Sequence, residues 1–224
     1  MERIQKIISN AGFCSRRKAE ELIIKGKVFV NGKKAVIGQK SDIEKDEIMV
    51  NNVVIKKNNP IYIMLNKPKN YEVTTAQNKK NVLELIPITE RIFPVGRLDK
   101  NTTGLLLLTN DGDFANKIMH PRYNKEKKYY VKTDKPILRK DIEAIEKGVR
   151  LKDGYIKGKI KQYHKDQIEI TVNEGKKHII KRLFFKLGYY VKELSRTQIG
   201  NLRLNVKVGK WRFLTKKEVE DLMK

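Results

Sequence analysis

The feature that most constrains the fold is the stretch from Pro94 to Tyr123, PVGRLDKNTTGLLLLTNDGDFANKIMHPRY. It places the tripeptide Arg97-Leu98-Asp99 in a loop bounded by glycines, directly ahead of a wholly apolar run from Leu105 to Leu108. A short apolar run without polar alternation predicts a strand that is buried on both faces. The chain must therefore build a covered sheet, and an accessible loop that carries a carboxylate precedes one of its strands.

From physics alone, the loop aspartate fits two roles. Asp99 can do chemistry, because a rigid strand fixes the position of the loop while the loop leaves the carboxylate accessible. Asp99 can equally be a surface carboxylate paired with Arg97, a contact that contributes little when it is exposed. Both roles stay open at this point.

Most of the chain predicts a sheet with helices beside it. Strand-like runs lie at residues 61–66, 104–109, 127–133, near 155–163, 168–172 and 189–199, and helices are expected at 112–119, 138–147 and 177–187. Thr215 followed by Glu218 predicts a capping box at the start of a final helix. Strands and helices without a regular alternation indicate an α+β fold around a mixed, mostly antiparallel sheet with flanking helices.

The N-terminal residues predict a smaller unit of two helices and a hairpin. Isoleucines at positions 4, 7 and 8 have helical spacing, and a second helix is expected from Ser15 to Gly26. Asn31-Gly32 then predicts a type I′ turn between two short strands. Residues 51–59 are polar and have little pattern, so we expect a first domain over 1–52, a linker over 53–59 and a second domain over 60–224.

The chain is strongly basic, with 50 Lys and Arg against 26 Asp and Glu and a formal net charge of +24. Compositional drift explains a preference for lysine over arginine, but it does not explain the shortage of acids. The excess of positive charge favours a nucleic acid as the partner. Residues 60–224 alone carry 37 basic and 19 acidic side chains, so this affinity is not confined to the smaller unit.

Other sequence features exclude several classes of protein. Cys14 is the only cysteine, which excludes an internal disulfide and a thiolate metal cluster. No window approaches the roughly 18 apolar residues of a membrane span, and the start resembles no signal peptide. We expect a cytoplasmic protein without membrane contact. Phosphate-binding glycine motifs are absent and the three histidines lack ligand spacing, so we expect neither a nucleotide nor a metal cofactor and interpret His120 and His178 as structural or RNA-facing.

Residues 15–33, SRRKAEELIIKGKVFVNGK, resemble the S4 RNA-binding module, which has the same order of helices and hairpin. The resemblance implies that an edge formed by Arg16, Arg17 and Lys18, with Lys33 nearby, lies against RNA phosphates. Basic side chains in the first turn oppose the helix dipole, which favours a role in ligand binding.

Residues 96–112, GRLDKNTTGLLLLTNDG, closely resemble the catalytic motif of the RsuA/RluB family of pseudouridine synthases. The resemblance extends over nearly the whole chain and implies the pseudouridine synthase fold, with Asp99 as the indispensable catalytic residue. The reaction detaches uracil from C1′ of its ribose, rotates it and rejoins it through C5. A carboxylate can attack the substrate covalently or stabilise charge while the glycosidic bond breaks, and the sequence leaves both routes open.

Two further segments match the family, one with a departure. EKKYYV at 126–131 resembles a strand whose tyrosine faces the active site, which implies Tyr129, while Tyr130 should face the other side. VNEGKKHIIKRLFFKLG at 172–188 resembles the basic helix that follows, but Ile179 replaces a glutamine and Lys181 replaces the first arginine. We expect Lys181 to pair with Asp99, and the alternative is that Arg182 turns inward.

The remaining assignments follow from the same resemblance. Arg97 is expected to be a further cation for RNA, Arg182 is also expected to bind the RNA substrate, and Leu204 is a candidate for the apolar contact beneath the uracil ring. We interpret Trp211 as an anchor for the final helix rather than a base-stacking residue.

Within the family, residues 119–131 look most like the RluB group, which implies a uridine in the large-subunit ribosomal RNA of bacteria. The small-subunit RsuA group is the nearest alternative, and a non-catalytic ribosome-assembly factor that holds RNA through an S4 module is the alternative from another class. We expect a monomer that acts on ribosomal RNA, either free or in ribosomal particles.

Overall fold

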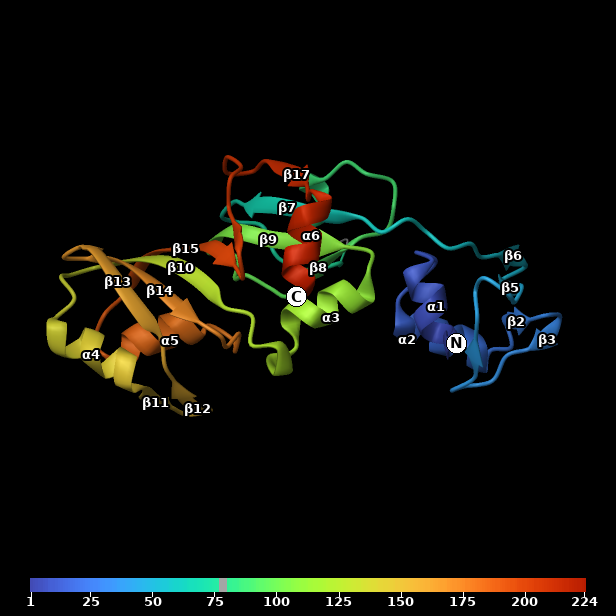
Figure 1. The fold of residues 1–224 in the computed structure, drawn as a ribbon, viewed down its shortest axis with the longest axis horizontal. Helices are drawn as coiled ribbons and strands as arrows, with labels where there is room; N and C mark the ends of the chain where they lie inside the picture. The colour runs from blue at the N-terminus through green and yellow to red at the C-terminus, as the bar shows by residue number, and fades with distance from the viewer. Residues whose placement is uncertain (77–79) are drawn as a thin grey trace. The chain divides into compact units, whose positions relative to one another are not determined.

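The structure is a computed structural model that describes residues 1–76 and 80–224, and Figure 1 traces the chain. The chain divides into two units. The first comprises Met1–Ile61 with Ile88–Ile92 and Asn110–Gly112, and the second comprises Tyr62–Pro87, Phe93–Thr109 and Asp113–Lys224.

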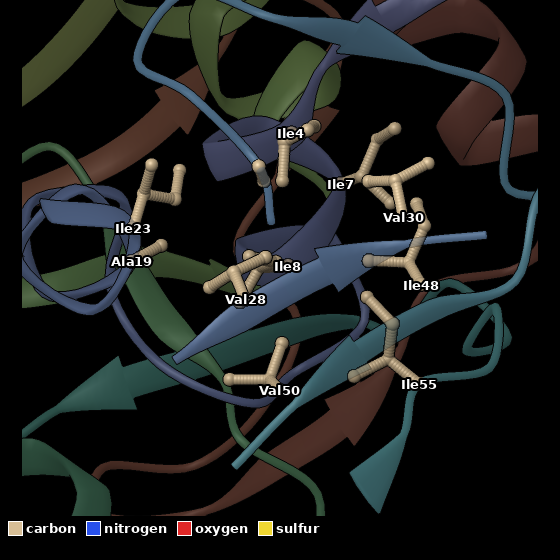
Figure 2. Packing of buried hydrophobic residues seen from close by; sticks show 11 residues of the cluster. Ile4, Ile7, Ile8, Ala19, Ile23, Val28, Val30, Ile48, Val50 and Ile55 are labelled. Carbon is tan, nitrogen blue, oxygen red and sulfur yellow. The ribbon is translucent and has the colours of Figure 1, made fainter. Parts of the chain in front are cut away.

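The first unit packs two helices against a small antiparallel sheet. Helix α1 spans Ile4–Asn10 and α2 spans Arg16–Ile24; the sheet has the order β3 (Lys33–Lys34), β2 (Val28–Val30), β5 (Ile48–Val50) and β6 (Val53–Val54), and β1 (Glu2–Arg3) pairs with β4 (Lys40–Ser41). Figure 2 shows apolar side chains of both helices and of β2 and β5 around one core, with Ile4, Ile8, Val28 and Val50 fully buried. The predicted order of two helices and a hairpin is confirmed.

Local signals fix the boundaries of this unit. The Ser15 hydroxyl caps α2 by accepting a hydrogen bond from the Lys18 amide at 3.2 Å. Asn31 and Gly32 adopt φ of 50° and 78°, as a type I′ turn requires. Asn51 and Asn52 also have positive φ, 49° and 65°, and reverse the chain into β6. The interval 53–59, in which the sequence predicts a linker, therefore opens with a strand, and the domain bounds 1–52 and 60–224 stay a prediction.

The second unit is built on a sheet of order β13-β14-β10-β15-β9-β7-β17. Within it β15 pairs with β9 in parallel and the other neighbours are antiparallel, as predicted for a mixed, mostly antiparallel sheet. The bounds are β7 (Tyr62–Lys67), β8 (Phe93–Val95), β9 (Thr103–Thr109), β10 (Lys127–Thr133), β13 (Lys159–His164), β14 (Gln167–Val172), β15 (Val191–Ile199), β16 (Leu202–Arg203) and β17 (Trp211–Phe213). A separate hairpin joins β11 (Val149–Leu151) to β12 (Gly154–Ile156), so the single run expected near 155–163 forms two strands.

Four helices accompany this sheet: α3 (Gly112–Met119), α4 (Arg139–Lys147), α5 (Ile179–Lys186) and α6 (Lys216–Met223), with short 3₁₀ turns at Val82–Leu85 and Pro121–Tyr123. Phe114 and Ile118 of α3 and Leu222 of α6 share a core with Leu105 and Leu107 of β9. The predicted capping box of α6 is present between Thr215 and Glu218.

Strand β9 is the centre of the second unit. Leu105, Leu106, Leu107 and Leu108 have no exposed surface, which confirms a strand buried on both faces. At its start β9 lies so close to β15 that a Cβ on Gly104 would be 2.3 Å from the carbonyl oxygen of Arg196. Gly104 also has a φ of 105°, a value that favours glycine. This tight approach fixes the strand end from which the Asp99 loop, residues 96–102, emerges.

Candidate active site

A buried lysine holds the backbone of the Asp99 loop through hydrogen bonds. Lys67, at the end of β7, has no exposed surface, and its ammonium donates hydrogen bonds to the carbonyl oxygens of Pro68 at 2.9 Å, Lys100 at 3.1 Å and Thr102 at 3.0 Å. Burial lowers the pKa of Lys67 to about 8, and the neighbouring Asp99 opposes that shift. Two of its three acceptors, the carbonyl oxygens of Lys100 and Thr102, follow Asp99 by one and three residues, so Lys67 fixes the backbone that carries the carboxylate.

The Asp99 carboxylate makes two contacts with the start of α5. Its Oδ2 lies 3.7 Å from the Lys181 ammonium, and its Oδ1 lies 3.1 Å from Nε2 of His178. The side chain is 28% exposed, which leaves the carboxylate accessible to a ligand. The predicted contact between Lys181 and Asp99 is present in the structure.

Arg182 points elsewhere. Its guanidinium forms a bidentate pair with Asp153, with both nitrogen to oxygen distances at 2.9 Å. In this structure Arg182 therefore does not contact Asp99, in contrast to the alternative in which it turns inward. Adjacent residues of a helix project about 100° apart, and Lys181 and Arg182 accordingly contact different carboxylates, those of Asp99 and Asp153. The RNA-binding role expected of Arg182 stays a prediction.

His178 was missed as a neighbour of Asp99. It precedes Lys181 by three residues, a spacing that places two helical side chains on one face. The signal was present, but His178 lies at the N-cap with φ 52° and ψ 27°, a backbone conformation that sequence spacing does not reveal. A non-glycine residue in this region is uncommon and indicates a local constraint.

A cavity of about 1190 Å³ opens beside Asp99. Such a volume exceeds that of most small-molecule pockets, about 300–1,000 Å³, and admits a nucleotide with its neighbours. Tyr129, Arg97 and Leu194 line it together with Asp99 and His178, and further cations in its wall are Lys100, Lys125, Lys127, Lys176, Lys177 and Arg196. We call this the Asp99 cavity. The structure thus brings Tyr129 and Arg97 to the same space as Asp99, and Tyr129 is 8% exposed in its wall.

Leu204 lies outside the Asp99 cavity. The residue packs against the core shared by β9, α3 and α6, and it does not line the Asp99 cavity. Its backbone is held by a hydrogen bond to the Thr197 carbonyl oxygen, which directs the chain after β16 back along β15. The uracil contact expected of Leu204 has no support in this geometry, and Leu194, on β15, is an apolar side chain that does line the cavity.

The predicted RNA edge of the first unit is exposed. Arg16, Arg17 and Lys18 lie at the start of α2 and Lys33 lies on β3, and all four side chains are exposed. Lys18 has an ion pair with Glu21 at 3.0 Å, while both ends of that pair are more than half exposed. We call these four residues the α2 basic edge.

Among residues 1–76 and 80–224, no group of three or more His, Cys, Asp or Glu side chains is placed to hold a metal ion. In the same residues, no helix is long and apolar enough to cross a membrane.

A basic unit of two helices and a hairpin, together with a cation-lined cavity around the accessible Asp99 carboxylate, is the arrangement expected of an enzyme that acts on RNA. The chain belongs to the RNA pseudouridylate synthase family, whose model matches residues 61–186, and an S4 domain model matches residues 2–38. It is therefore a pseudouridine synthase of the S4-containing RsuA/RluB type, an isomerase that acts on RNA.

Relatives match over the full length of the chain. Ribosomal large subunit pseudouridine synthase B of Bacillus subtilis is 41% identical, over 99% of this chain and 96% of the relative. Dual-specificity RNA pseudouridine synthase RluF of Escherichia coli is 39% identical, over 99% of this chain and 78% of the relative. A crystal structure of a pseudouridylate synthase superposes with a TM-score of 0.73 at 29% identity and covers 99% of this chain and all of the other.

Proposed function

We propose that this enzyme converts one uridine of bacterial large-subunit ribosomal RNA to pseudouridine, with Asp99 as the catalytic residue. The observation that carries the proposal is the accessible Asp99 carboxylate in a cation-lined cavity. This carboxylate pairs with Lys181, and Lys67 holds the backbone of its loop through hydrogen bonds. The large-subunit assignment rests on the full-length similarity to the Bacillus subtilis enzyme of that name.

Three side chains divide the work in this proposal. The bond between N1 of uracil and C1′ breaks, the base rotates, a bond between C5 and C1′ forms, and the proton of C5 is replaced by one on N1. Asp99 attacks C1′ or stabilises the positive charge that develops there, and Lys181 pairs with the Asp99 carboxylate and holds it in position. Tyr129 stacks on the base, and its hydroxyl takes part in the proton transfer from C5.

The reaction changes neither the oxidation state nor the composition of the nucleotide, so the proposal requires no cofactor. A stacked uridine must first be flipped from its RNA helix or loop, which costs about a few kcal/mol. Contacts in the cavity offset that cost, and the α2 basic edge with Arg97 and Arg182 positions the RNA through its phosphates. We propose that a monomer acts on the RNA, free or in ribosomal particles.

The test is a map of pseudouridines across both ribosomal RNAs in wild-type cells, in a deletion strain and in an Asp99→Asn strain. We expect one large-subunit position to lose its pseudouridine in both mutants. Loss of a small-subunit position would correct the substrate, and unchanged maps would replace the enzymatic proposal with that of a non-catalytic RNA-binding factor.

A further inference from the structure

Two cations in the wall of the Asp99 cavity are unexplained by the chemistry of Asp99. Arg196 lies on β15, directly across from Tyr129 of β10 in the antiparallel register. Lys127 lies two residues before Tyr129 and therefore on the same face of β10. Both line the cavity.

Arg196 is a buried guanidinium with unused hydrogen-bonding capacity. Its residue is 3% exposed, and its Nε donates a hydrogen bond to the Leu105 carbonyl oxygen at 2.7 Å. Its Nη2 is buried and has no hydrogen-bond partner among the residues that the structure describes. A buried charge that is only partly satisfied is costly, and such a group in a cavity wall indicates a ligand that completes it.

Lys127 adds a second positive charge beside it. The Lys127 ammonium donates to the carbonyl oxygens of Lys125 at 3.1 Å and Asn173 at 3.5 Å. Burial, and then the nearby Arg196, lower the pKa of Lys127 to about 8. Two neighbouring cations repel each other in a partly desolvated site, and an anion placed between them would relieve that repulsion.

The carboxylates that line the cavity are those of Glu72, Asp99 and Glu174, and among the described residues none of them forms a hydrogen bond or an ion pair with Arg196 or Lys127. Asp99 contacts His178 and Lys181, and Glu174 pairs with Lys176 at 2.9 Å. Within the described part of the chain, neither Arg196 nor Lys127 has a carboxylate at ion-pair distance.

We propose that Arg196 and Lys127 form a phosphate subsite that binds one phosphodiester group next to the target uridine. This inference rests on the proposed function and deepens it, because it states how the flipped nucleotide is anchored. Guanidinium and ammonium groups bind phosphate through charge-assisted hydrogen bonds, which are stronger than neutral ones. A phosphate fixed beside Tyr129 would set the position of the ribose relative to Asp99, whereas contacts of exposed lysines would only hold the RNA near the cavity.

The experiment compares the binding of uridine, uridine 5′-monophosphate and uridine 3′-monophosphate to the full-length protein by calorimetry at low salt. We expect at least one monophosphate to bind wild type about tenfold more tightly than uridine, as one charge-assisted contact predicts. Lys127→Met should remove most of that advantage, and Arg196→Lys should remove it as well, because lysine lacks the guanidinium fork.

Lys128→Met is the matched control. Lys128 is the next residue of β10, faces away from the cavity and lies 3.8 Å from Glu169. Lys128→Met removes one positive charge, as Lys127→Met does, so the two variants have the same net charge. The control should keep the advantage of the monophosphate. An equal advantage in Lys127→Met, Lys128→Met and Arg196→Lys would overturn the subsite, as would a monophosphate that binds wild type no better than uridine. Should Arg196→Lys fail to fold, Lys127→Met decides alone.

The measurement needs no turnover. An unchanged pseudouridine map in the Asp99→Asn strain would therefore refute the proposed function and leave the phosphate subsite standing. A map that loses one position, together with no advantage for either monophosphate, would refute only the subsite.

Discussion

The two units of the chain carry positive charge in different physical states. The α2 basic edge presents exposed side chains, whereas Lys67 and Arg196 of the second unit are 0% and 3% exposed. Exposed cations cost little to maintain and attract any polyanion, with an energy that salt screens. Buried cations are costly unless specific acceptors hold them, so each is tied to one geometry. The first arrangement suits RNA capture, and the second suits the positioning of one nucleotide.

The largest effect should come from the carboxylate at the centre of the second unit. We expect Asp99→Asn to lower the rate of pseudouridine formation by at least about 10³-fold, because the amide carries no charge and is a poor nucleophile. RNA affinity should stay near that of wild type, since the α2 basic edge is untouched. Single-turnover kinetics and a filter-binding titration measure the two quantities, and a parallel loss of affinity would break the division between capture and chemistry.

Removal of the buried ammonium beneath the loop should have the next largest effect. Lys67→Met leaves the carbonyl oxygens of Pro68, Lys100 and Thr102 without their donor. We expect the free energy of unfolding to fall by about 2–4 kcal/mol, as for other disrupted buried polar networks, and activity to fall with it. Urea denaturation measures the first quantity.

The difference in the free energy of unfolding between wild type and Lys67→Met should depend on pH, and this dependence provides a control. The pKa of Lys67 is about 8 in the folded protein and about 10.4 in an unfolded chain, so between these values the unfolded state binds more protons. The stability of wild type relative to Lys67→Met should therefore rise as the pH increases from about 8 to about 10.4. A constant difference across this range would show that the lysine titrates normally.

Lys181 and Arg182 are neighbouring cations of α5 that contact different carboxylates, so their variants compare a cation paired with Asp99 with a cation paired at the surface. We expect Lys181→Ala to lower the rate about 10-fold to 10²-fold, because Asp99 loses its paired cation, while Lys181→Arg restores most of it. Arg182→Ala should change the rate less than about threefold, since an exposed pair such as that with Asp153 contributes little. Single-turnover rates at saturating RNA decide, and an active Lys181→Ala enzyme would refute the assignment.

Local sequence signals predicted the parts of the molecule that depend on neighbouring residues. The run from Leu105 to Leu108 predicted β9, because four consecutive apolar residues indicate a buried strand. Asn31-Gly32 predicted a turn and the pair Thr215 and Glu218 predicted a helix cap, because these signals also lie within a few residues of one another. The family motif located Asp99, and helix spacing made Lys181 its expected partner.

Contacts between distant segments were not predicted. Lys67 closes hydrogen bonds with carbonyl groups 33 and 35 residues further along the chain, and no local pattern encodes them. The buried Arg196 depends on the close approach of β15 to Gly104, and Leu204 was misplaced because the turn after β16 directs it into the core.

The smallest effect should come from the α2 basic edge. Replacement of Arg16, Arg17 and Lys18 by glutamine should weaken RNA binding several-fold, because each lost phosphate contact reduces the slope of log K against log salt by about 0.7–0.9. Rates at saturating RNA should be unchanged, since none of these residues lies in the Asp99 cavity. A matched control replaces Lys216 and Lys217 of α6 together with Lys224, which removes three exposed charges from the other unit. An equal loss of slope in the control would show that binding follows total charge alone and that the two units do not divide the work.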